Sequence, residues 1–187
     1  MLVLVGASGT GKSAIRNYLV SEYQMDKVVS CTSRPIREGE KDGQDYFFLQ
    51  KEEFECRIKN DWFVEYTLYN DNYYGIPKHQ IKDNSIVIVE PDGVLALKKQ
   101  ENINLTIVYL QSLRSVRKER MRKRGDTEEQ IKQRIELDDL RFDLIKENVD
   151  YIVDNDGNSI EDIANFVFQL YNIESQLKTM ELMSIKD

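Results

Sequence analysis

The chain has 187 residues, of which 41% are hydrophobic and 32% are charged, and its formal net charge is −7. This length fits one compact domain with a well-buried core, and the apolar fraction excludes a chain that is disordered throughout. The negative charge argues against a general nucleic-acid or anionic-membrane surface, because the summed field would repel a polyanion. Any phosphate site must therefore be locally basic.

The cysteines and the apolar runs predict where the protein works. Cys31 and Cys56 do not have the spacing of metal ligands, and they suggest a reducing compartment rather than a disulfide framework. The sequence has no run of about 18 apolar residues, and the apolar strand at residues 1–5 leaves no room for a signal peptide. We expect a cytoplasmic protein with no membrane partner and no nucleic-acid partner.

A glycine-rich run follows that first strand and fits the P-loop pattern G-x-x-x-x-G-K-[ST]. Its residues are Gly6, Ala7, Ser8, Gly9, Thr10, Gly11, Lys12 and Ser13. Glycines let the backbone curl so that several N–H groups point at a polyphosphate, while Lys12 adds positive charge and the Ser13 hydroxyl can ligate Mg²⁺. Ile15 and Leu19 share one face of a predicted helix, so strand, loop and helix occur in the required order. The run predicts an ATP site.

A second phosphate site is predicted after a short strand at residues 27–30. Arg34 and Arg37 stand three residues apart beside small hydroxyl residues and a proline-stiffened backbone, which is typical of a phosphate clamp. A solvated basic turn is the alternative interpretation. The tyrosine-rich residues that follow predict a small α+β insert at 30–80. Its expected elements are strands at 46–49, 62–66 and 72–76 and a helix at 50–61.

The second half of the chain alternates strands with helices. Strands are expected at 84–90, 105–110 and 150–154, and helices at 93–99, at 128–145 and from Ser159 onward. This alternation predicts an α/β fold in three layers with a mostly parallel sheet. In the terminal helix, Ile160, Ile163, Phe166, Val167, Leu170 and Ile173 are expected on one apolar face. Leu177, Met180 and Met183 continue this spacing, which indicates either a dimer contact or a loosely packed tail.

Several separated motifs occur in one order along the chain. They are Ser33-Arg34-Pro35-x-Arg37-x-Gly39-Glu40-x-Asp42-Gly43-x-Asp45-Tyr46-x-Phe48, then Phe63-Val64-Glu65, then Asn72-Tyr73-Tyr74-Gly75. Together with the P-loop, this series resembles guanylate kinase, and the resemblance extends to about residue 170. It implies that Arg34, Arg37, Tyr46 and Tyr74 grip the phosphate of a nucleoside monophosphate.

The same resemblance implies that Ser30 and Glu65 hydrogen-bond a guanine base. Guanine offers an N1–H and an exocyclic N2–H₂ as adjacent donors, which one carboxylate can accept as a pair, whereas adenine offers no such pair. Glu65 is therefore the expected determinant of base specificity. A surface glutamate on a strand is the alternative.

Residues 114–125 are strongly basic on an otherwise acidic chain. Arg120, Arg124 and Arg134 match the lid pattern of the family, R-[LM]-x-x-R-G followed by an arginine on the next helix. Lid arginines stabilise the charge of a loose phosphoryl transition state and help to exclude water. We expect these three to be catalytic with Lys12 and Arg34. The family's last strand ends in an asparagine near the adenine of ATP, which implies that role for Asn155, although an Asn-Asp-Gly turn explains this residue equally well.

The sequence departs from the family pattern at two places. The family has two aspartates separated by one residue ahead of its glycine, and Ile88 and Glu90 occupy those positions here, at the end of the strand expected at 84–90. Glu90 is retained as a predicted monophosphate-binding residue, and Asp92 is a geometric substitute for the missing carboxylate. Ile76 replaces a hydroxyl residue, which removes a hydrogen bond to the base of about 1 kcal/mol. These departures leave the base and sugar specificity open.

The predicted function is Mg²⁺-dependent transfer of the γ-phosphoryl group of ATP to a nucleoside monophosphate, with GMP or dGMP as the favoured acceptor. A related kinase acting on another monophosphate or on a ribose bisphosphate is the first alternative, and a catalytically silent peptide-binding module is the second. One domain is expected, as a monomer or homodimer. Its core would comprise residues 1–29, 81–119 and 142–187, its insert 30–80 and its lid 120–141.

Overall fold

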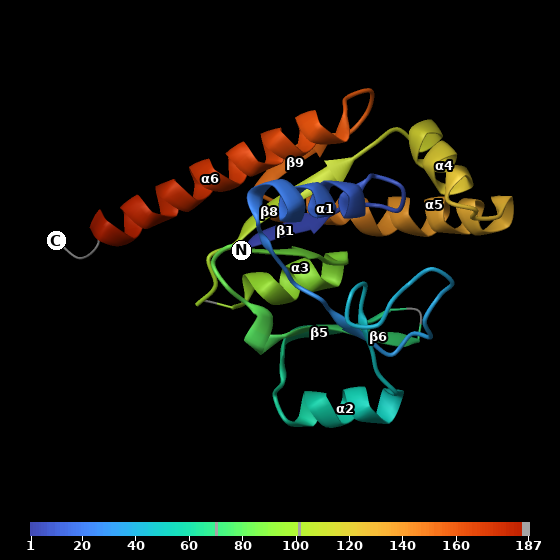
Figure 1. The fold of residues 1–187 in the computed structure, drawn as a ribbon, viewed down its shortest axis with the longest axis horizontal. Coiled ribbons are helices and arrows are strands. Elements are labelled where there is room, and N and C mark those ends of the chain that lie inside the picture. Colours follow the sequence, from blue (N-terminus) through green and yellow to red (C-terminus); the bar gives the residue numbers. More distant parts are fainter. Residues whose placement is uncertain (70, 101, 185–187) are drawn as a thin grey trace.

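The computed structural model describes residues 1–69, 71–100 and 102–184, apart from the side chains of Tyr69, Thr179 and residues 181–184. Helices cover both faces of a central parallel sheet, and a smaller sheet with one helix lies beside this core (Figure 1). The α/β class and the mostly parallel sheet predicted from the sequence are confirmed. Within the described ranges, no helix is long and apolar enough to cross a membrane.

The central sheet has the strand order β2-β7-β1-β8-β9, and every neighbouring pair is parallel. Its strands are β1 (Leu2–Val5), β2 (Asp26–Lys27), β7 (Ser85–Ile88), β8 (Thr106–Gln111) and β9 (Tyr151–Asp154). β1 lies in the middle of the sheet, and all four of its residues are buried. A strand covered on both faces needs apolar side chains in both directions, which explains its unbroken apolar sequence.

Two apolar cores lie on the two faces of this sheet. On one face, Leu2 and Leu4 pack with residues of α1 (Lys12–Tyr23) and α6 (Ile160–Ser184). On the other face, Val3 and Val5 pack with residues of α3 (Pro91–Lys98) and with Phe142 at the end of α5 (Glu128–Asp143). Because side chains alternate along a strand, β1 contributes to both cores.

The second sheet has the order β4-β3-β6-β5. Its elements are β3 (Cys31–Thr32), β4 (Phe47–Phe48), β5 (Phe63–Tyr69) and β6 (Asn72–Pro77), with helix α2 (Lys51–Lys59) and a 3₁₀ turn η1 (Lys78–Gln80). Phe54 of α2 is fully buried and stacks on Phe63 and Tyr73, with ring centroids 4.5 and 5.2 Å apart. Aromatic stacking thus holds α2 on the small sheet, in which β3 and β4 have only two residues each.

The strand predicted at residues 27–30 exists as β2, but it lies earlier, at Asp26–Lys27, and the chain leaves the central sheet after Val28, whose N–H donates to Ile86 O at 3.0 Å. The Gln80 side chain accepts from Val29 N at 2.7 Å and donates to Val29 O at 2.9 Å. This amide satisfies both backbone groups of Val29, so the residue needs no strand partner. These two hydrogen bonds join the segment that leads into the small sheet, at Val29, to the segment that follows its last strand, at Gln80.

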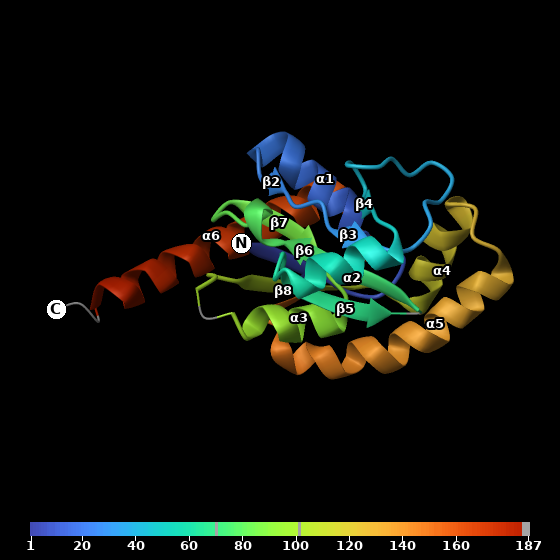
Figure 2. The ribbon, with the colours of Figure 1, turned by 90° about the horizontal axis from the view of Figure 1, so that it is seen from below.

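Helices α4 (Arg114–Lys123) and α5 lie at one end of the molecule. Figure 2 shows the loop between β3 and β4 at this same end, and Figure 1 agrees. α5 begins with a capping box at Thr127 and Gln130, and it continues after Asp143 as a 3₁₀ turn, η2 (Leu144–Asn148). The predicted helix at 128–145 is thus nearly right.

The terminal helix α6 has a narrower buried face than the spacing suggested. Ser159 accepts from Asp162 N at 3.0 Å at its start, as expected of a cap. Ile163 and Val167 are buried, whereas Ile160, Phe166 and Ile173 are about half exposed, so the core covers only part of the predicted apolar face. Leu177 and Met180 are also exposed, and the side chain of Met183 lies outside the described ones. Figure 1 explains the difference, because the second half of α6 extends past the sheet.

Candidate active site

The glycine-rich loop joins the end of β1 to the start of α1. Gly9 and Gly11 adopt left-handed φ values of +81° and +94°, which side chains rarely tolerate. At Gly9 a Cβ would also lie 2.8 Å from the carbonyl oxygen of Arg117 in α4. The loop therefore depends on glycine both for its curl and for the close approach of α4.

Three consecutive carbonyl groups of the loop are held by side chains from distant segments. The contacts are Ser8 O with Arg117 Nε at 2.9 Å, Gly9 O with Arg120 Nη1 at 3.3 Å, and Thr10 O with Asn155 Nδ2 at 2.8 Å. In a trans peptide the N–H of the next residue points away from the carbonyl. Drawing these oxygens outward thus turns the N–H groups of Gly9 and Gly11 inward, as phosphate binding requires.

Lys12 folds back over the same loop. Its Nζ donates to Gly6 O and to Ala7 O, the latter at 2.9 Å. Burial lowers the pKa of Lys12, while the negative charges of Glu90 and Asp138 oppose this shift. A cation poised between carbonyl groups can transfer its hydrogen bonds to a phosphate.

Arg34 and two aromatic residues form a compact cluster in the small sheet. Arg34 is only 9% exposed, and its Nη2 donates to both carboxylate oxygens of Glu40 at 2.7 and 3.0 Å. The guanidinium lies 5.6 Å from the Tyr46 ring centroid, and the Tyr46 and Tyr74 rings are 6.0 Å apart. Glu40 thus fixes the direction of a cation that has only limited room to move.

Arg37 lies within electrostatic range of both Arg34 and Arg134 of α5. Its backbone N donates to Glu40 Oε2 at 2.8 Å. Partial burial lowers the pKa of Arg37, and the positive charges of Arg34 and Arg134 add to this effect. An anion placed among these three arginines would relieve their mutual repulsion.

Glu65 on β5 is a buried carboxyl group. It is 7% exposed, and among the described residues its Oε2 has no hydrogen-bond partner. Burial, with a smaller contribution from the charge of Asp92, raises the pKa of Glu65 to about 8. An unsatisfied buried oxygen is costly, so it marks a place where a ligand donor is expected. Ser30 is partly buried, and its carbonyl accepts from Phe47 N at 2.9 Å.

Glu90 lies between β7 and α3, immediately after the strand rather than inside it. Burial raises the pKa of Glu90, whereas Lys12 and Arg141 act in the opposite direction. Arg141 Nη2 donates to Asp92 Oδ2 at 2.7 Å, and its Nη1 lies 3.9 Å from Glu90. The two carboxylates after β7 thus share one arginine of α5, while Ile88 is partly buried against the α1 side of the sheet.

The predicted lid arginines do not occupy one place. Arg120 contacts the glycine-rich loop and also donates to Asn155 O at 2.8 Å. Arg124 is about half exposed and pairs with Asp126. The positive charge of Arg134 lowers the pKa of Arg37, as described above. The structure thus brings Arg120 and Asn155 to the loop, and it holds Arg124 on the outside.

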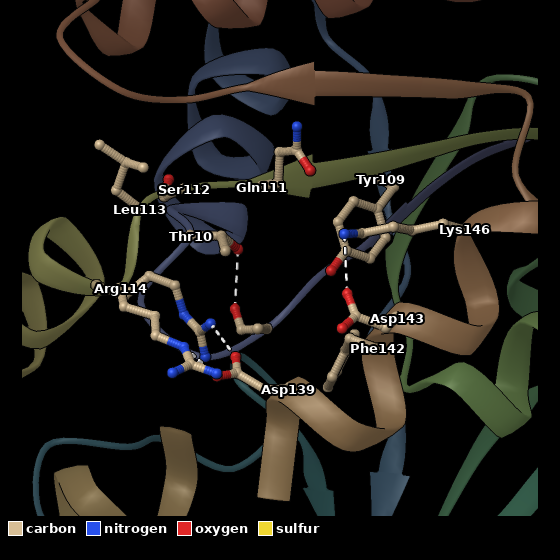
Figure 3. A pocket seen from close by; sticks show the side chains of 12 residues that line it. Thr10, Tyr109, Gln111, Ser112, Leu113, Arg114, Asp139, Phe142, Asp143 and Lys146 are labelled. Carbon is tan, nitrogen blue, oxygen red and sulfur yellow. Dashed lines mark hydrogen bonds and ion pairs between the residues drawn. The ribbon is translucent and has the colours of Figure 1, made fainter. Parts of the chain in front are cut away.

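A cavity of about 280 Å³ lies behind the loop, between β8, α4 and α5. In Figure 3 Thr10 faces it from one side, Arg114 reaches toward Asp139, and Lys146 reaches toward Asp143. The charges of its wall are therefore largely neutralised in pairs. Burial raises the pKa of Tyr109 in this wall to about 12.

The sequence did not predict a role for three of the residues at the site. Glu40 orients Arg34, and Arg117 and Asp138 both contact the backbone of Ser8. Glu40 was part of a recognised motif, so its position near Arg34 in the sequence was a usable signal. Asp138 lies 130 residues from Ser8, and nothing in the sequence indicates that contact.

Comparisons with known proteins agree with this geometry. A family model described as guanylate kinase matches residues 1–171. A protein named guanylate kinase from Aster yellows witches'-broom phytoplasma is 37% identical over 166 residues, which cover 83% of this chain and 78% of that one. A second, from Latilactobacillus sakei, is 35% identical over 184 residues, with 89% and 87% covered. The solved guanylate kinase structure from Anaplasma phagocytophilum has a TM-score of 0.73 at 24% identity, covering 93% and 85%, and supports the fold alone.

Proposed function

This chain belongs to the guanylate kinase family, and from that premise we propose that it transfers the γ-phosphoryl group of ATP to GMP, giving ADP and GDP. The choice of base rests on the buried Glu65 carboxyl group, whose Oε2 has no hydrogen-bond partner in the described part of the chain. The glycine-rich loop is the proposed donor site, and the small sheet is the proposed acceptor site.

On the donor side, the inward N–H groups of Gly9 and Gly11 and the ammonium of Lys12 would bind the phosphates of ATP. Ala7, Ser8 and Thr10 complete the proposed loop. Its outward carbonyls are held by Arg120 and Asn155, which supports a role for both residues in ATP binding. Preorganised donors stabilise the transferred group without having to reorient during the reaction.

On the acceptor side, Arg34, Arg37, Tyr46 and Tyr74 would hold the phosphate of GMP. The carboxylate of Glu40 keeps the Arg34 guanidinium in place. The acceptor phosphate oxygen is already ionised, so the reaction needs no general base and no covalent intermediate. Catalysis then rests on aligning two phosphates and neutralising their charge.

The guanine base would lie against Glu65 and Ser30, with Glu90 at the side of the site toward Lys12. A carboxylate accepts the N1–H and N2–H₂ donors of guanine together, which adenine cannot match. A base without these two donors would leave the oxygens of Glu65 without hydrogen bonds, and its binding would therefore be weaker.

The residues present fit one Mg²⁺ ion. Ser13 is exposed at the start of α1, and the Glu90 carboxyl group interacts electrostatically with Lys12 beside it. In kinase sites Mg²⁺ takes one or two protein oxygens and completes its shell with phosphate oxygens and water. When bound, the ion neutralises charge on the β- and γ-phosphates. We propose Ser13 as its direct protein ligand.

Two segments are proposed to close over the nucleotides, the insert at residues 30–80 and the lid at 120–141. The Gln80–Val29 pairing at the base of the insert supports the first boundary. Closure would carry Arg124 and Arg134 toward the transferred phosphate and exclude water. The remaining residues, 1–29, 81–119 and 142–187, form the proposed core.

The proposed setting is the cytoplasm, in agreement with the free cysteines Cys31 and Cys56. The proposed assembly is a monomer or a homodimer, since Ile173, Leu177 and Met180 form an exposed apolar row on α6. Sedimentation at several protein concentrations distinguishes these two states.

The test is an ADP-release assay with ATP and Mg²⁺ against GMP, dGMP, AMP, CMP, UMP and dTMP. We expect activity with GMP that is lost in Lys12→Ala and that loses its base preference in Glu65→Gln. Equal rates with every base would overturn the role of Glu65. Preference for another monophosphate would indicate the related kinase, and no ADP with any acceptor would indicate a silent binding module.

A further inference from the structure

We propose that Arg117 and Asp138 form a brace that sets the conformation of the phosphate loop, and that they act as positioning residues for ATP binding. The claim that the brace contributes to catalysis rests on the proposed kinase function. The claim that it sets the conformation of the loop rests only on the contacts described below.

The brace holds both sides of one residue. The Ser8 N–H donates to Asp138 Oδ2 at 2.6 Å, and Ser8 O accepts from Arg117 Nε at 2.9 Å. Arg117 Nη2 lies 3.4 Å from the same Asp138 oxygen, so the two side chains and the Ser8 backbone close a ring. The two peptide groups flanking Ser8 are thereby fixed in direction.

Both members of the brace are buried, Arg117 at 4% and Asp138 at 6% exposure. A buried ion pair by itself is weak evidence for stability, because desolvation offsets much of the attraction. Here, however, the guanidinium has further partners: Arg117 Nη1 donates to Asp139 Oδ1 at 2.8 Å, and Nε donates to Ser8 O. The arrangement indicates that the pair determines a conformation.

The conformation it determines is the one that phosphate binding needs. Ser8 O shares a peptide group with the Gly9 N–H, so the bond from Arg117 directs that N–H toward the interior of the loop. The backbone of α4 at Arg117 also packs against Gly9. Because Arg117 lies on α4 and Asp138 on α5, the brace links the loop to the two helices that contain most of the proposed lid at 120–141.

A purely electrostatic account predicts the opposite sign for one variant. Asp138 is a negative charge near Lys12, so its removal should strengthen ATP binding if charge alone mattered. If the brace positions the loop, its removal should weaken ATP binding even though the site becomes more positive. The sign of the change therefore separates the two accounts.

The experiment measures ATP binding by calorimetry with Mg²⁺ and without GMP. Asp138→Ala should raise the Kd for ATP about tenfold, the expected cost of losing one hydrogen bond to a charged group. Asp138→Asn keeps an oxygen acceptor for the Ser8 N–H, so it should recover most of the affinity. Asp143→Ala is the matched control, since it removes a charge from the same helix at a position whose ion-pair partner is Lys146. In the kinase assay, Asp138→Ala should raise KM for ATP and leave KM for GMP unchanged.

Two further measurements keep the proposal open to refutation if Asp138→Ala does not fold. The double variant Arg117→Met/Asp138→Leu replaces the buried pair with apolar side chains, which proteins commonly tolerate. This variant should fold, and it should bind ATP more weakly than the unaltered chain does. Amide exchange at Ser8 needs no nucleotide, and its protection should fall in every variant that lacks an acceptor at 138. Unchanged or tighter ATP binding in a folded variant without the brace would overturn the proposal. Absence of GMP phosphorylation by the unaltered chain would overturn only the proposed function.

Discussion

GMP binding near neutral pH is expected to release a proton from Glu65. In the free protein, burial raises the pKa of this carboxyl group from 4.5 to about 8, so it is largely protonated at pH 7. Guanine donors favour the ionised form and should bring that pKa well below 7. Close to one proton should therefore leave the Glu65 carboxyl group for each GMP bound at pH 7.

The same pKa shift affects stability. Between pH 4.5 and 8 the folded chain keeps a proton that the unfolded chain has lost, so stability falls as pH rises and levels off above pH 8. At about 1.4 kcal/mol for each pH unit, the total loss from Glu65 is on the order of 5 kcal/mol. Glu65→Gln should remove this slope, so the variant should gain stability relative to the unaltered chain as pH rises.

Calorimetry in buffers with different ionisation enthalpies gives the number of protons released. Glu65→Gln with GMP is the control, because it retains any proton exchange by the nucleotide phosphate, and urea unfolding at pH 6 and 9 gives the stability difference. An equal proton count for the unaltered chain and Glu65→Gln would refute the reasoning. A common pH slope of unfolding for both proteins would do the same.

Three further predictions test other parts of the site and fold. Gly9→Ala should abolish ATP binding measured by calorimetry. Gly39→Ala should keep it, because Gly39 also has a positive φ but a Cβ added there would have no atom within 4 Å. Equal losses of binding in the two variants would contradict the packing argument. Glu40→Gln should raise KM for GMP about tenfold, since it loosens Arg34, and a matching rise in KM for ATP would count against a local role. Thr127→Ala should lower the free energy of unfolding in urea by about 1 kcal/mol with unchanged KM values, and no loss would show that the cap is dispensable.

The features predicted well from the sequence are those that depend on neighbouring residues. The loop at Gly6 to Ser13 requires a strand before it and a helix after it, and both are read from local apolar spacing. The start of the helix predicted at 128–145 is likewise a local feature, since Thr127 caps it and acidic residues occupy its first turn. Motif order also indicated which residues of the small sheet to examine, although their roles stay predictions.

The features missed depend on contacts between distant segments. Val29 leaves the strand because an amide 51 residues away satisfies its backbone, and no propensity encodes that pairing. The basic run at 114–125 gave no sign that Arg117 would be buried while Arg124 would face solvent. Burial of a charge is decided by what the fold places around it, and for Arg117 that is two carboxylates from α5.

The position of β1 also has a consequence for the order of folding during synthesis. β1 ends at Val5, but its two neighbours, β7 and β8, are complete only at Ile88 and Gln111. At ribosomal rates of about 5–20 residues per second, the first strand waits roughly 5–20 s for its second partner. The small sheet, whose paired strands all lie between Cys31 and Pro77, can form during that wait. In proteolysis of stalled nascent chains, we expect the small sheet to become resistant at a shorter chain length than the central sheet.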